Sequence, residues 1–251
     1  MSEEDLVLRE WSAPAVAASA LATPGFTQAT FETFAKPLEI KAAVTPAVRE
    51  RARDLVGRKY RSRGYMVGQS QPSLPGAEPV TLTALKGEEV IGTLSVRFDG
   101  DAGLAADAVF ADELAAMRES GHKLCECTQF AIDGDEASRH VQLNLFQAAY
   151  LAAYRLRGAR TLVVEVNPRH VGFYRRMLGF KICSGERMNP RVNAPAVLMS
   201  LDFCWAQQQL ARYAGQPALA RVARNLFPCF QSVLEERRML EALARDIGSV
   251  H

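Results

Sequence analysis

The chain has 251 residues, of which 48% are hydrophobic and 23% charged, and its formal net charge is +2 at pH 7. This composition is ordinary for a globular protein that buries a full core. The small net charge, without any stripe of basic and aromatic residues, argues against nucleic acid as a partner.

The cysteines and the N-terminus bear on the compartment. The five cysteines are an odd number and include no CxxC pair, so we interpret them as free thiols of a reducing compartment; a metal site or a disulfide is the alternative. The four histidines show no ligand spacing, and no metal site is predicted. The acidic start, MSEEDLVLRE, is unlike a signal peptide, and no apolar stretch approaches the roughly 20 residues that span a bilayer. We therefore expect a cytoplasmic protein without an integral membrane segment.

The first elements follow an Ala-, Ser-, Thr- and Pro-rich segment. That segment, residues 1–33, predicts a partly disordered N-terminal arm. A strand is expected over 34–44, with Ile40 and Val44 pointing inward. The Thr-Pro pair at 45–46 suits the start of the next helix, because threonine caps a helix and proline fits its first position.

Two strands joined by a tight turn form the next predicted unit. Residues 80–86 and 89–99 are rich in β-branched residues and flank Gly87-Glu88, which is typical of an antiparallel hairpin. A helix is expected over 104–121, and it ends at a glycine. Its apolar stripe consists of Phe110, Leu114 and Met117.

The central part of the chain alternates between strand and helix. A strand over 124–132, a long helix over 138–157 and a strand over 162–166 predict a parallel pair with a right-handed crossover. Two closing antiparallel strands are expected over 180–185 and 196–203.

From residue 205 onward the sequence turns helical. Apolar residues at helical spacing predict amphipathic helices that pack on the rest of the protein: Leu219, Val222, Leu226, Val233, Leu240 and Leu243. The predicted organisation is an arm over 1–33, a domain over 34–204 and a C-terminal helical appendage over 205–251. The predicted fold class is α/β, one mixed sheet with helices on both faces.

The segment 162–180, LVVEVNPRHVGFYRRMLGF, is the most informative of the chain. It combines a buried strand, a sharp turn at Asn167-Pro168 and a short helix. Pro168 suits the first turn of that helix, and Gly179 suits an end that needs positive φ. Such a unit places polar groups at the carboxyl end of a sheet, where open α/β folds build their sites.

This segment resembles the closing motif of the GNAT acyltransferase superfamily. The matching residues are Asn167, Phe173, Tyr174, Gly179 and Phe180. The chain departs from the motif at His170, which stands at a small-residue position, and by one extra residue between Tyr174 and Gly179. The alternative is an ordinary αβ unit with a surface tyrosine.

Within that superfamily the chain resembles the N-acyl amino acid synthases, relatives of the acyl-homoserine-lactone synthases. The similarity is carried by the segments TLTALKGEEVIGTLSVRFD, GLAADAVFADEL, LCECTQFAID, VNPRHVGFYRRMLGF and PRVNAPAVLMSLDF. Gly103, Leu104, Ala106 and Asp107 match the family's loop before the helix that covers the acyl-chain pocket. The resemblance implies a GNAT-like, mostly antiparallel sheet with a splayed central parallel pair.

The acyl donor is the next expectation. GNAT enzymes that use coenzyme A usually carry glycines before the long helix, where backbone N–H groups approach a pyrophosphate. Here Arg139 stands first, and Gln142 and Asn144 replace the glycines. This departure favours an acyl donor whose phosphopantetheine arm is attached to acyl carrier protein, with coenzyme A as the alternative. No permanently bound cofactor is expected.

The implied reaction is attack of an amino acid's amino group on a long-chain acyl thioester. Glu126 is predicted to take the proton, Glu165 is its rival on the neighbouring strand, and a plain ion pair is the structural alternative. Tyr174 is predicted to protonate the leaving thiolate or to anchor the pantetheine arm, unless it only packs against Phe173.

Further residues are predicted to contact substrate. A backbone N–H between Thr128 and Phe130 would polarise the carbonyl, facing residues 164–166. Arg169 and His170 would orient the acceptor carboxylate or a donor phosphate, next to Asn167 and Phe173 of the motif. Phe110 and Leu114, with Met117, would line an acyl tunnel or else form plain core.

An acidic carrier protein would dock on basic residues. The candidates are Arg157, Arg160, Arg175, Arg176 and Lys181, with Lys59, Arg61 and Arg63 as a second group. An N-acyl amino acid synthase is thus the first hypothesis for function. A coenzyme A-dependent N-acetyltransferase of a small amine and a non-catalytic, GNAT-shaped binding module are the alternatives.

Overall fold

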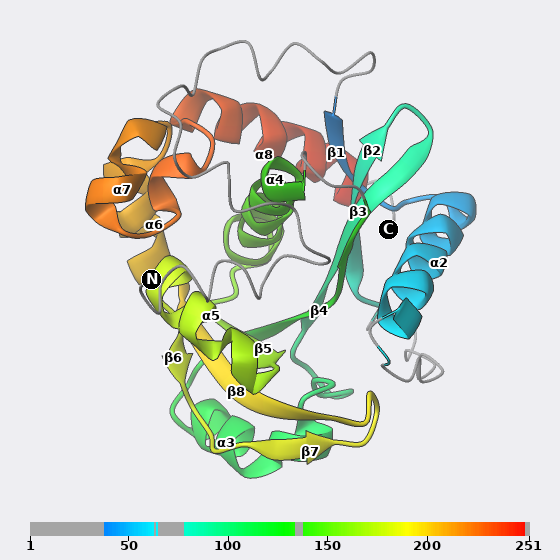
Figure 1. The fold of residues 1–251 in the computed structure, drawn as a ribbon, viewed down its shortest axis with the longest axis vertical. Helices are drawn as coiled ribbons and strands as arrows, with labels where there is room; N and C mark the ends of the chain where they lie inside the picture. Colours follow the sequence, from blue (N-terminus) through cyan, green and yellow to red (C-terminus); the bar gives the residue numbers. More distant parts are fainter. Residues whose placement is uncertain (1–37, 63, 65–77, 134–137, 249–251) are drawn as a thin grey trace.

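The computed structural model describes residues 38–62, 64, 78–133 and 138–248. Its centre is a sheet in the order β1-β2-β3-β4-β5-β8-β6, with β7 paired to β8 (Figure 1). The strands are β1 (Leu38–Ala42), β2 (Val80–Lys86), β3 (Glu89–Phe98), β4 (Leu124–Ile132), β5 (Thr161–Val166), β6 (Lys181–Ile182), β7 (Arg187–Asn189) and β8 (Ala194–Asp202). Among these strands only β4 and β5 pair in parallel, so the mixed, mostly antiparallel sheet is confirmed.

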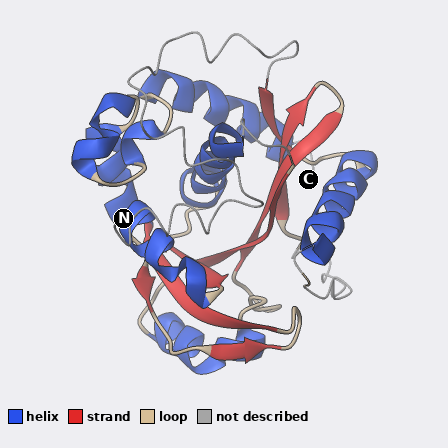
Figure 2. Cartoon of the chain, in the orientation of Figure 1, coloured by secondary structure: helices blue, strands red, loops and turns tan. Residues whose placement is uncertain are grey.

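Helices cover both faces of this sheet (Figure 2). They are α2 (Pro46–Ser62), α3 (Asp107–Glu119), α4 (Ser138–Tyr150), α5 (Val171–Leu178), α6 (Phe203–Tyr213), α7 (Ala220–Ala223) and α8 (Val233–Gly248). Helices α2 and α3 pack on one face, while α4, α5 and the C-terminal helices share the main core on the other. The end of α4 continues as a π-helical segment, Leu151–Leu156.

Strands β4 and β5 pair only at their amino-terminal ends. The register joins Leu124 to Thr161, Cys125 to Leu162 and Glu126 to Val163, and it stops there although both strands continue. Beyond Glu126, β4 follows β3 while β5 follows β8, and the two strands diverge (Figure 1). The expected splay is therefore present, with its open side at the carboxyl ends of the strands.

A β-bulge in β4 lies just beyond the point where the two strands separate. The pairing with β3 shifts between Ser95↔Thr128 and Thr93↔Ala131, which gives β4 one extra residue. Gln129 sits in the bulge with φ 55°, a backbone region that L residues rarely adopt. Ser95 Oγ donates a hydrogen bond to Gln129 Oε1 at 3.0 Å. Because a bulge bends its strand, this extra residue accounts for the turn of β4 away from β5.

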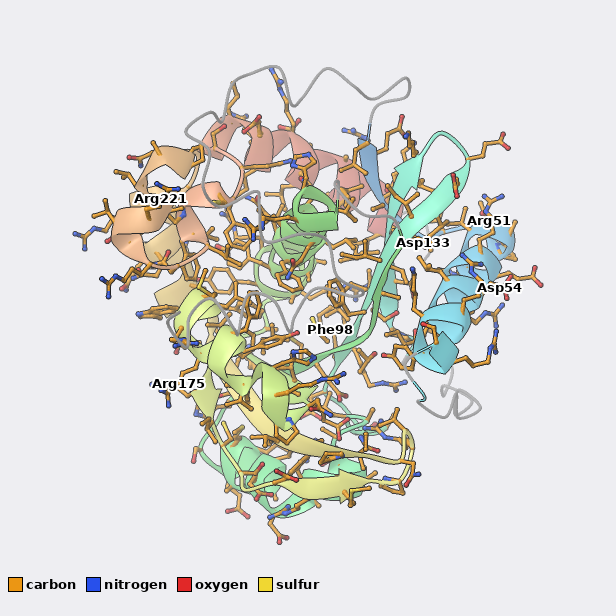
Figure 3. The ribbon with its side chains drawn as sticks, in the orientation of Figure 1. Arg51, Asp54, Phe98, Asp133, Arg175 and Arg221 are labelled. Carbon is orange, nitrogen blue, oxygen red and sulfur yellow. The ribbon has the colours of Figure 1, made fainter. Side chains whose placement is uncertain are left out.

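The first helix and the hairpin form as expected. Thr45 Oγ1 accepts a hydrogen bond from Val48 N at 3.4 Å at the start of α2, and Gly87 adopts φ 65° in the turn between β2 and β3. Asp133, directly after β4, lies beside α2 (Figure 3). It pairs with Arg58 and Lys59 of that helix, so α2 is tied to the far end of β4.

Some expectations for the outer elements are wrong. Val44 lies beyond β1 and is 37% exposed, because the strand ends at Ala42. The amphipathic helix expected around Leu219, Val222 and Leu226 breaks up, since Arg224 adopts φ 51° and ends α7. Val222 and Val233 are largely exposed, and Leu219 is exposed as well. The closing strand expected over 180–185 shortens to β6, and β7 is an element that the sequence did not indicate.

The helices after residue 205 contribute to the same core as the sheet. Met239, Leu243 and Ile247 of α8 are buried in the main cluster, and Asp246 Oδ2 accepts a hydrogen bond from Ala42 N at 3.1 Å. The division of the chain at 204 stays a prediction, and the arm predicted over 1–33 lies outside the described residues. None of the helices described here combines the length and apolar character needed to cross a bilayer.

Candidate functional site

Glu126 is a fully buried carboxyl at the point where β4 and β5 separate. It is the last residue of β4 that pairs with β5, and its exposed fraction is 0%. Oε2 accepts a hydrogen bond from Ala105 N at 2.6 Å, whereas Oε1 has no hydrogen-bond partner among the described residues. Burial, and next the negative charge of Glu165, raise the pKa of Glu126 to about 7. A carboxyl that ionises near neutral pH with one free oxygen is suited to proton transfer.

Glu165 lies on the neighbouring strand β5 with both oxygens engaged. Oε1 accepts a hydrogen bond from Asn189 Nδ2 at 2.9 Å, and Oε2 is paired with Arg191. Asn189 Oδ1 in turn accepts a hydrogen bond from Arg191 N at 2.9 Å. Burial raises the pKa of Glu165, while Arg191 and Asn189 oppose the rise. The two glutamates therefore differ, since only Glu126 keeps an oxygen without a partner in the described part of the chain.

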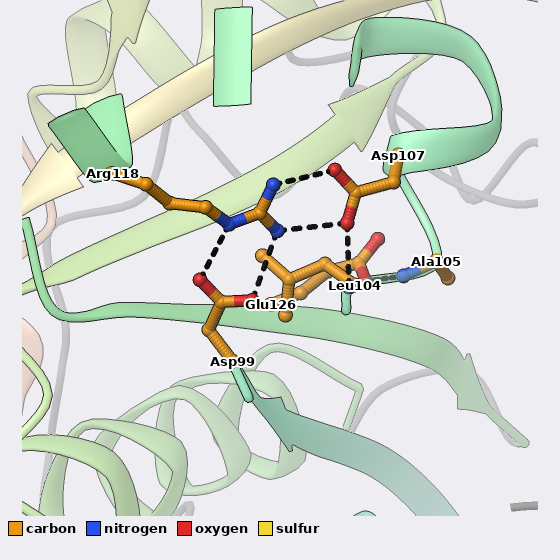
Figure 4. Close-up of polar contacts among 6 residues, drawn as sticks. All are labelled: Asp99, Leu104, Ala105, Asp107, Arg118 and Glu126. Carbon is orange, nitrogen blue, oxygen red and sulfur yellow. Dashed lines mark hydrogen bonds and ion pairs between the residues drawn. The ribbon is translucent and has the colours of Figure 1, made fainter. Parts of the chain in front are cut away.

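The loop before α3 supplies the N–H group that reaches Glu126 (Figure 4). Within this loop Leu104 N donates a hydrogen bond to Asp107 Oδ2 at 2.7 Å. Arg118, near the end of α3, binds Asp107 and Asp99 at the same time through distances of 2.8 to 2.9 Å. The Arg118 guanidinium holds the pKa of Asp107 below its ordinary value. Asp107 is a family match in the sequence, but nothing in the sequence pointed to Arg118 or Ala105.

Tyr174 stands on α5, the short helix after β5. The Asn167 side chain caps the preceding turn by accepting from Arg169 N at 3.3 Å, and Gly179 ends α5 with φ 77°. The ring of Tyr174 packs edge-on against Phe173 and Phe180 at 5.7 and 5.3 Å. Burial raises the pKa of the half-buried phenol. Tyr174 therefore keeps its proton at neutral pH and can donate a hydrogen bond.

The groups around the Tyr174 phenol affect its ionisation. The Cys127 thiol of β4 is the second cause that raises the pKa of Tyr174, and the Tyr60 phenol of α2 follows. Tyr174 and Cys127, the residue that follows Glu126 on β4, pack against the same core cluster. The structure thus places Glu126 and Glu165 on the two separating strands and Tyr174 on the helix that follows β5, and their catalytic roles stay predictions.

The remaining predicted residues differ in burial and in the contacts that they make. Thr128 and Phe130 are half-buried on β4, and the Phe130 ring contacts Phe146 at 5.2 Å between ring centroids. Arg169 is exposed, and its Nε donates to His170 Nε2 at 3.2 Å. No described contact ties Arg169 or His170 to Glu126, so their substrate roles stay predictions.

The residues predicted to replace a pyrophosphate loop lie at the start of α4. Arg139 is exposed, while Gln142 and Asn144 are each 3% exposed. Asn144 is held by the C-terminal segment, because its Oδ1 accepts a hydrogen bond from Gln231 Nε2, and its Nδ2 donates to His140 O at 2.8 Å. The Gln142 Nε2 atom is buried without a partner among the described residues. Side chains thus fill the space where glycines would leave backbone exposed.

Phe110 and Leu114 are fully buried on α3. They pack with Val163 of β5 and Leu198 of β8, and the Arg187 guanidinium lies 5.2 Å from the centroid of the Phe110 ring. Phe110 and Leu114 thus belong to a core cluster, and their contact with an acyl chain stays a prediction.

Asn189 and Arg191 are site residues that the sequence did not predict. Arg191 stands in the PRVNAPAVLMSLDF segment, which entered the sequence comparison only as a family match, and Asn189 directly precedes that segment. The sequence shows only an arginine and an asparagine shortly before β8, the strand that pairs with β5. Nothing local in the sequence indicates that the turn before β8 reaches back to Glu165.

Comparisons with known proteins identify relatives of the chain. The family model of the N-acyl amino acid synthase FeeM matches residues 51–202. The structure of FeeM, an N-acyl amino acid synthase from uncultured soil microbes, is 32% identical, with a TM-score of 0.65 over 72% of this chain and 98% of that one. The acyl-homoserine-lactone synthase LasI is 16% identical, with a TM-score of 0.47 over 66% of this chain and 89% of that one. No curated protein sequence matches the chain with significance.

The family model covers more than half of the chain, and the FeeM structure matches it along nearly its own whole length. The GNAT-like fold class expected from the sequence is confirmed, and so is the expected enzyme class, an N-acyltransferase. The chain belongs to the FeeM family of N-acyl amino acid synthases.

Proposed function

We propose that this enzyme moves a long-chain acyl group from an acyl-carrier-protein thioester to the amino group of an amino acid. The observation that carries the proposal is the Glu126 carboxyl, fully buried at the separating strands with a pKa of about 7 and an unpartnered Oε1 among the described residues. An amino acid presents its nitrogen as an ammonium ion at neutral pH, so a base is needed before that nitrogen can attack a thioester.

The proposed reaction divides the work between two side chains. Glu126 takes a proton from the ammonium, and the neutral amine attacks the thioester carbonyl. The C–N bond forms and the C–S bond breaks, and the second proton of the attacking nitrogen goes to the leaving thiolate, with Tyr174 donating a hydrogen bond or relaying this proton. The backbone of β4 beyond Glu126 is not paired with β5, and an N–H there would stabilise the tetrahedral oxyanion by on the order of 3 kcal/mol.

The acceptor would be recognised through its zwitterion. Arg191 has a side chain 33% exposed and is paired with Glu165 on β5, the strand that lies beside Glu126. A guanidinium binds a carboxylate through paired hydrogen bonds. We therefore assign the acceptor carboxylate to Arg191, and the acceptor ammonium to the space before Glu126. Glu165 holds the guanidinium in place from the other side.

A carrier-bound donor is supported by the start of α4 and by the surface of α5. Gln142 and Asn144 are buried side chains there, and Asn144 is engaged by the C-terminal segment, which leaves little room for a pyrophosphate. Arg175 and Arg176 are exposed on α5, and Figure 3 shows Arg175 at the periphery of the molecule. In the second basic group Lys59 is already paired with Asp133 at 2.7 Å. All five cysteines are free, which supports the proposal that the enzyme works in the reducing cytoplasm.

The test is a donor-by-acceptor matrix with purified protein. Acyl carrier proteins and coenzyme A thioesters of several chain lengths are each offered with every amino acid, and products are identified by mass spectrometry. We expect amides from carrier-bound donors, and a loss of roughly 10²- to 10⁴-fold in kcat for Glu126→Gln. Acetyl-coenzyme A turnover that exceeds every carrier-bound donor would establish a small-amine acetyltransferase instead.

Two variant sets separate the remaining possibilities. Reversing Arg175 and Arg176 to Glu should weaken turnover with carrier-bound donors and leave coenzyme A thioesters unaffected. If acylated carrier binds without turnover, and Glu126→Gln changes nothing, the protein is a non-catalytic binding module.

A further inference from the structure

The hydrogen bond from Ala105 N to Glu126 Oε2 links the buried carboxyl to a loop that has no other part in the proposed chemistry. The donor–acceptor distance is 2.6 Å. Among the described residues, no other group donates a hydrogen bond to the Glu126 carboxylate. This hydrogen bond decides which oxygen is occupied and which is left for a substrate. The position of the loop therefore sets the orientation of the proposed base.

The loop before α3 is held by ionic contacts among Asp107, Arg118 and Asp99 (Figure 4). Asp107 Oδ2 accepts from Leu104 N at 2.7 Å, which closes the turn directly before Ala105. Arg118 Nη1 and Nη2 bind the two carboxylate oxygens of Asp107, each at 2.8 Å. The same guanidinium binds Asp99 through Nε at 2.8 Å and Nη2 at 2.9 Å.

The anchor point of this set is the sheet. Asp99 directly follows β3, and its N–H donates to Leu124 O at 3.2 Å, at the start of β4. Arg118 thereby ties the loop to β4, which carries Glu126, and to β3, which is the neighbouring strand. The planar fork of an arginine can hold two carboxylates in this way, whereas the ammonium of a lysine is a point charge without that geometry.

We propose that Arg118 is a positioning residue for Glu126: by clamping Asp107 to Asp99 it holds the Ala105 N–H on Glu126 Oε2 and keeps Oε1 directed to the reacting amine. The inference rests on the proposed function, since it gives Glu126 the role of base. It predicts that loosening the clamp changes the ionisation of Glu126 although Arg118 does not touch that residue.

The direction of the change follows from the hydrogen bond. The Ala105 N–H lowers the pKa of Glu126 because it favours the ionised carboxylate. Loss of that contact should raise the pKa of Glu126 further, by roughly one unit. The charged groups that act on Glu126 from the packed elements are Glu165 of β5, Arg191 before β8 and Arg97 of β3, and the variants below leave all of them in place.

The experiment is a carbon-13 NMR titration of protein labelled at the glutamate carboxyls. Glu126→Gln identifies the signal, and the pKa of Glu126 is measured in wild type, Arg118→Gln and Arg118→Lys. The matched control is Glu113→Gln, which removes another bidentate arginine pair of α3, with Arg187 at 2.5 and 2.9 Å, that does not reach the loop. We expect a rise of the pKa in Arg118→Gln, a smaller rise in Arg118→Lys and none in Glu113→Gln.

Each outcome of the titration either supports the clamp or refutes it. An unchanged pKa of Glu126 in folded Arg118→Gln overturns the proposal, and so does full rescue by Arg118→Lys, because charge alone would then suffice. If Arg118→Gln does not fold, Arg118→Lys and Asp107→Asn decide: a raised pKa in both supports the clamp, and an unchanged pKa in either refutes it.

This readout does not depend on turnover. A raised pKa in a protein that forms no amide would contradict the proposed function while leaving the positioning intact. Where amide is formed, the acid limb of the kcat/KM profile should move to higher pH in Arg118→Gln and stay in place in Glu113→Gln.

Discussion

At the scale of single residues, the buried Glu126 carboxyl carries a stability cost that depends on pH. Its pKa is raised from 4.5 to about 7, so the folded protein favours the protonated form. Below pH 4.5 the carboxyl is neutral in both states and the fold is not penalised. As pH rises toward 7, the unfolded chain ionises first and the free energy of unfolding falls.

Replacing Glu126 by glutamine should remove this dependence. We expect Glu126→Gln to gain stability relative to wild type between about pH 4.5 and 7, by roughly 2–3 kcal/mol over that window. Urea unfolding at a series of pH values measures it. Glu88→Gln, which changes an exposed carboxyl in the turn between β2 and β3, is the control and should show no such gain. A constant difference between Glu126→Gln and wild type across this range would contradict the burial argument.

Gln129 makes a second prediction at this scale, because it occupies the bulge with φ 55°. A β-branched side chain tolerates this region worst, whereas glycine adopts it freely but also gains entropy in the unfolded chain. Gln129→Val should therefore destabilise the protein by about 1–2 kcal/mol, and Gln129→Gly should stay within about 1 kcal/mol of wild type. Thermal unfolding compares the two variants. Equal losses in both would indicate that the glutamine side chain, bound by Ser95, matters more than the backbone.

At the scale of elements, the end of α5 shows how a turn and a close approach share one position. Gly179 adopts φ 77°, and a Cβ atom there would overlap the indole ring of Trp205 on α6. Gly158 adopts φ 69° with no atom within 4 Å of such a Cβ, so it isolates the backbone cost. We expect Gly158→Ala to cost about 1 kcal/mol and Gly179→Ala about 2–4 kcal/mol.

A double-mutant cycle tests the cause of this difference. In a Trp205→Ala background the clash is gone, and the cost of Gly179→Ala should fall to that of Gly158→Ala. Urea unfolding of the four proteins provides the measurement. An unchanged cost would place the whole effect in the backbone of the turn.

The elements that the sequence predicted well are those with a local signal. The hairpin follows from β-branched strands around Gly87, and α5 follows from Pro168 and Gly179. Strand β4 was placed from Leu124 to Ile132, and the structure gives it the same ends. The bulge at Gln129 has no such signal, because glutamine is not a residue that favours positive φ, and only the pairing with β3 requires it.

The site residues also divide into those with a local sequence signal and those without one. Glu126 and Glu165 could be predicted because each stands on one of two strands expected to be neighbours. Arg118 and Arg191 could not, since the first acts across a turn of backbone and the second arrives from a turn far along the chain. Contacts of this kind are set by tertiary packing, which a periodic pattern does not encode.

At the scale of the whole molecule, the C-terminal helices decide whether the core is complete. The expectation of an appendage came from composition, since the sequence after residue 205 changes from alternating elements to helices. In the structure α8 packs against α4 and β1 at the edge of the sheet. In a chain that lacks α8, the part of the core that its buried side chains cover would be exposed to solvent.

Leu243 tests this integration most directly, because its side chain is 0% exposed within the main cluster. Leu243→Ala should lower the free energy of unfolding by about 2–5 kcal/mol, as a large-to-small change does in a packed core. The control is Val233→Ala on the same helix, where the side chain is 74% exposed and the change should stay within about 0.5 kcal/mol. If α8 belongs to the same cooperative unit, Leu243→Ala shifts one unfolding transition that is followed equally by tryptophan fluorescence and by circular dichroism. Two separate transitions, with only the smaller one shifted, would instead establish the C-terminal helices as an independent unit.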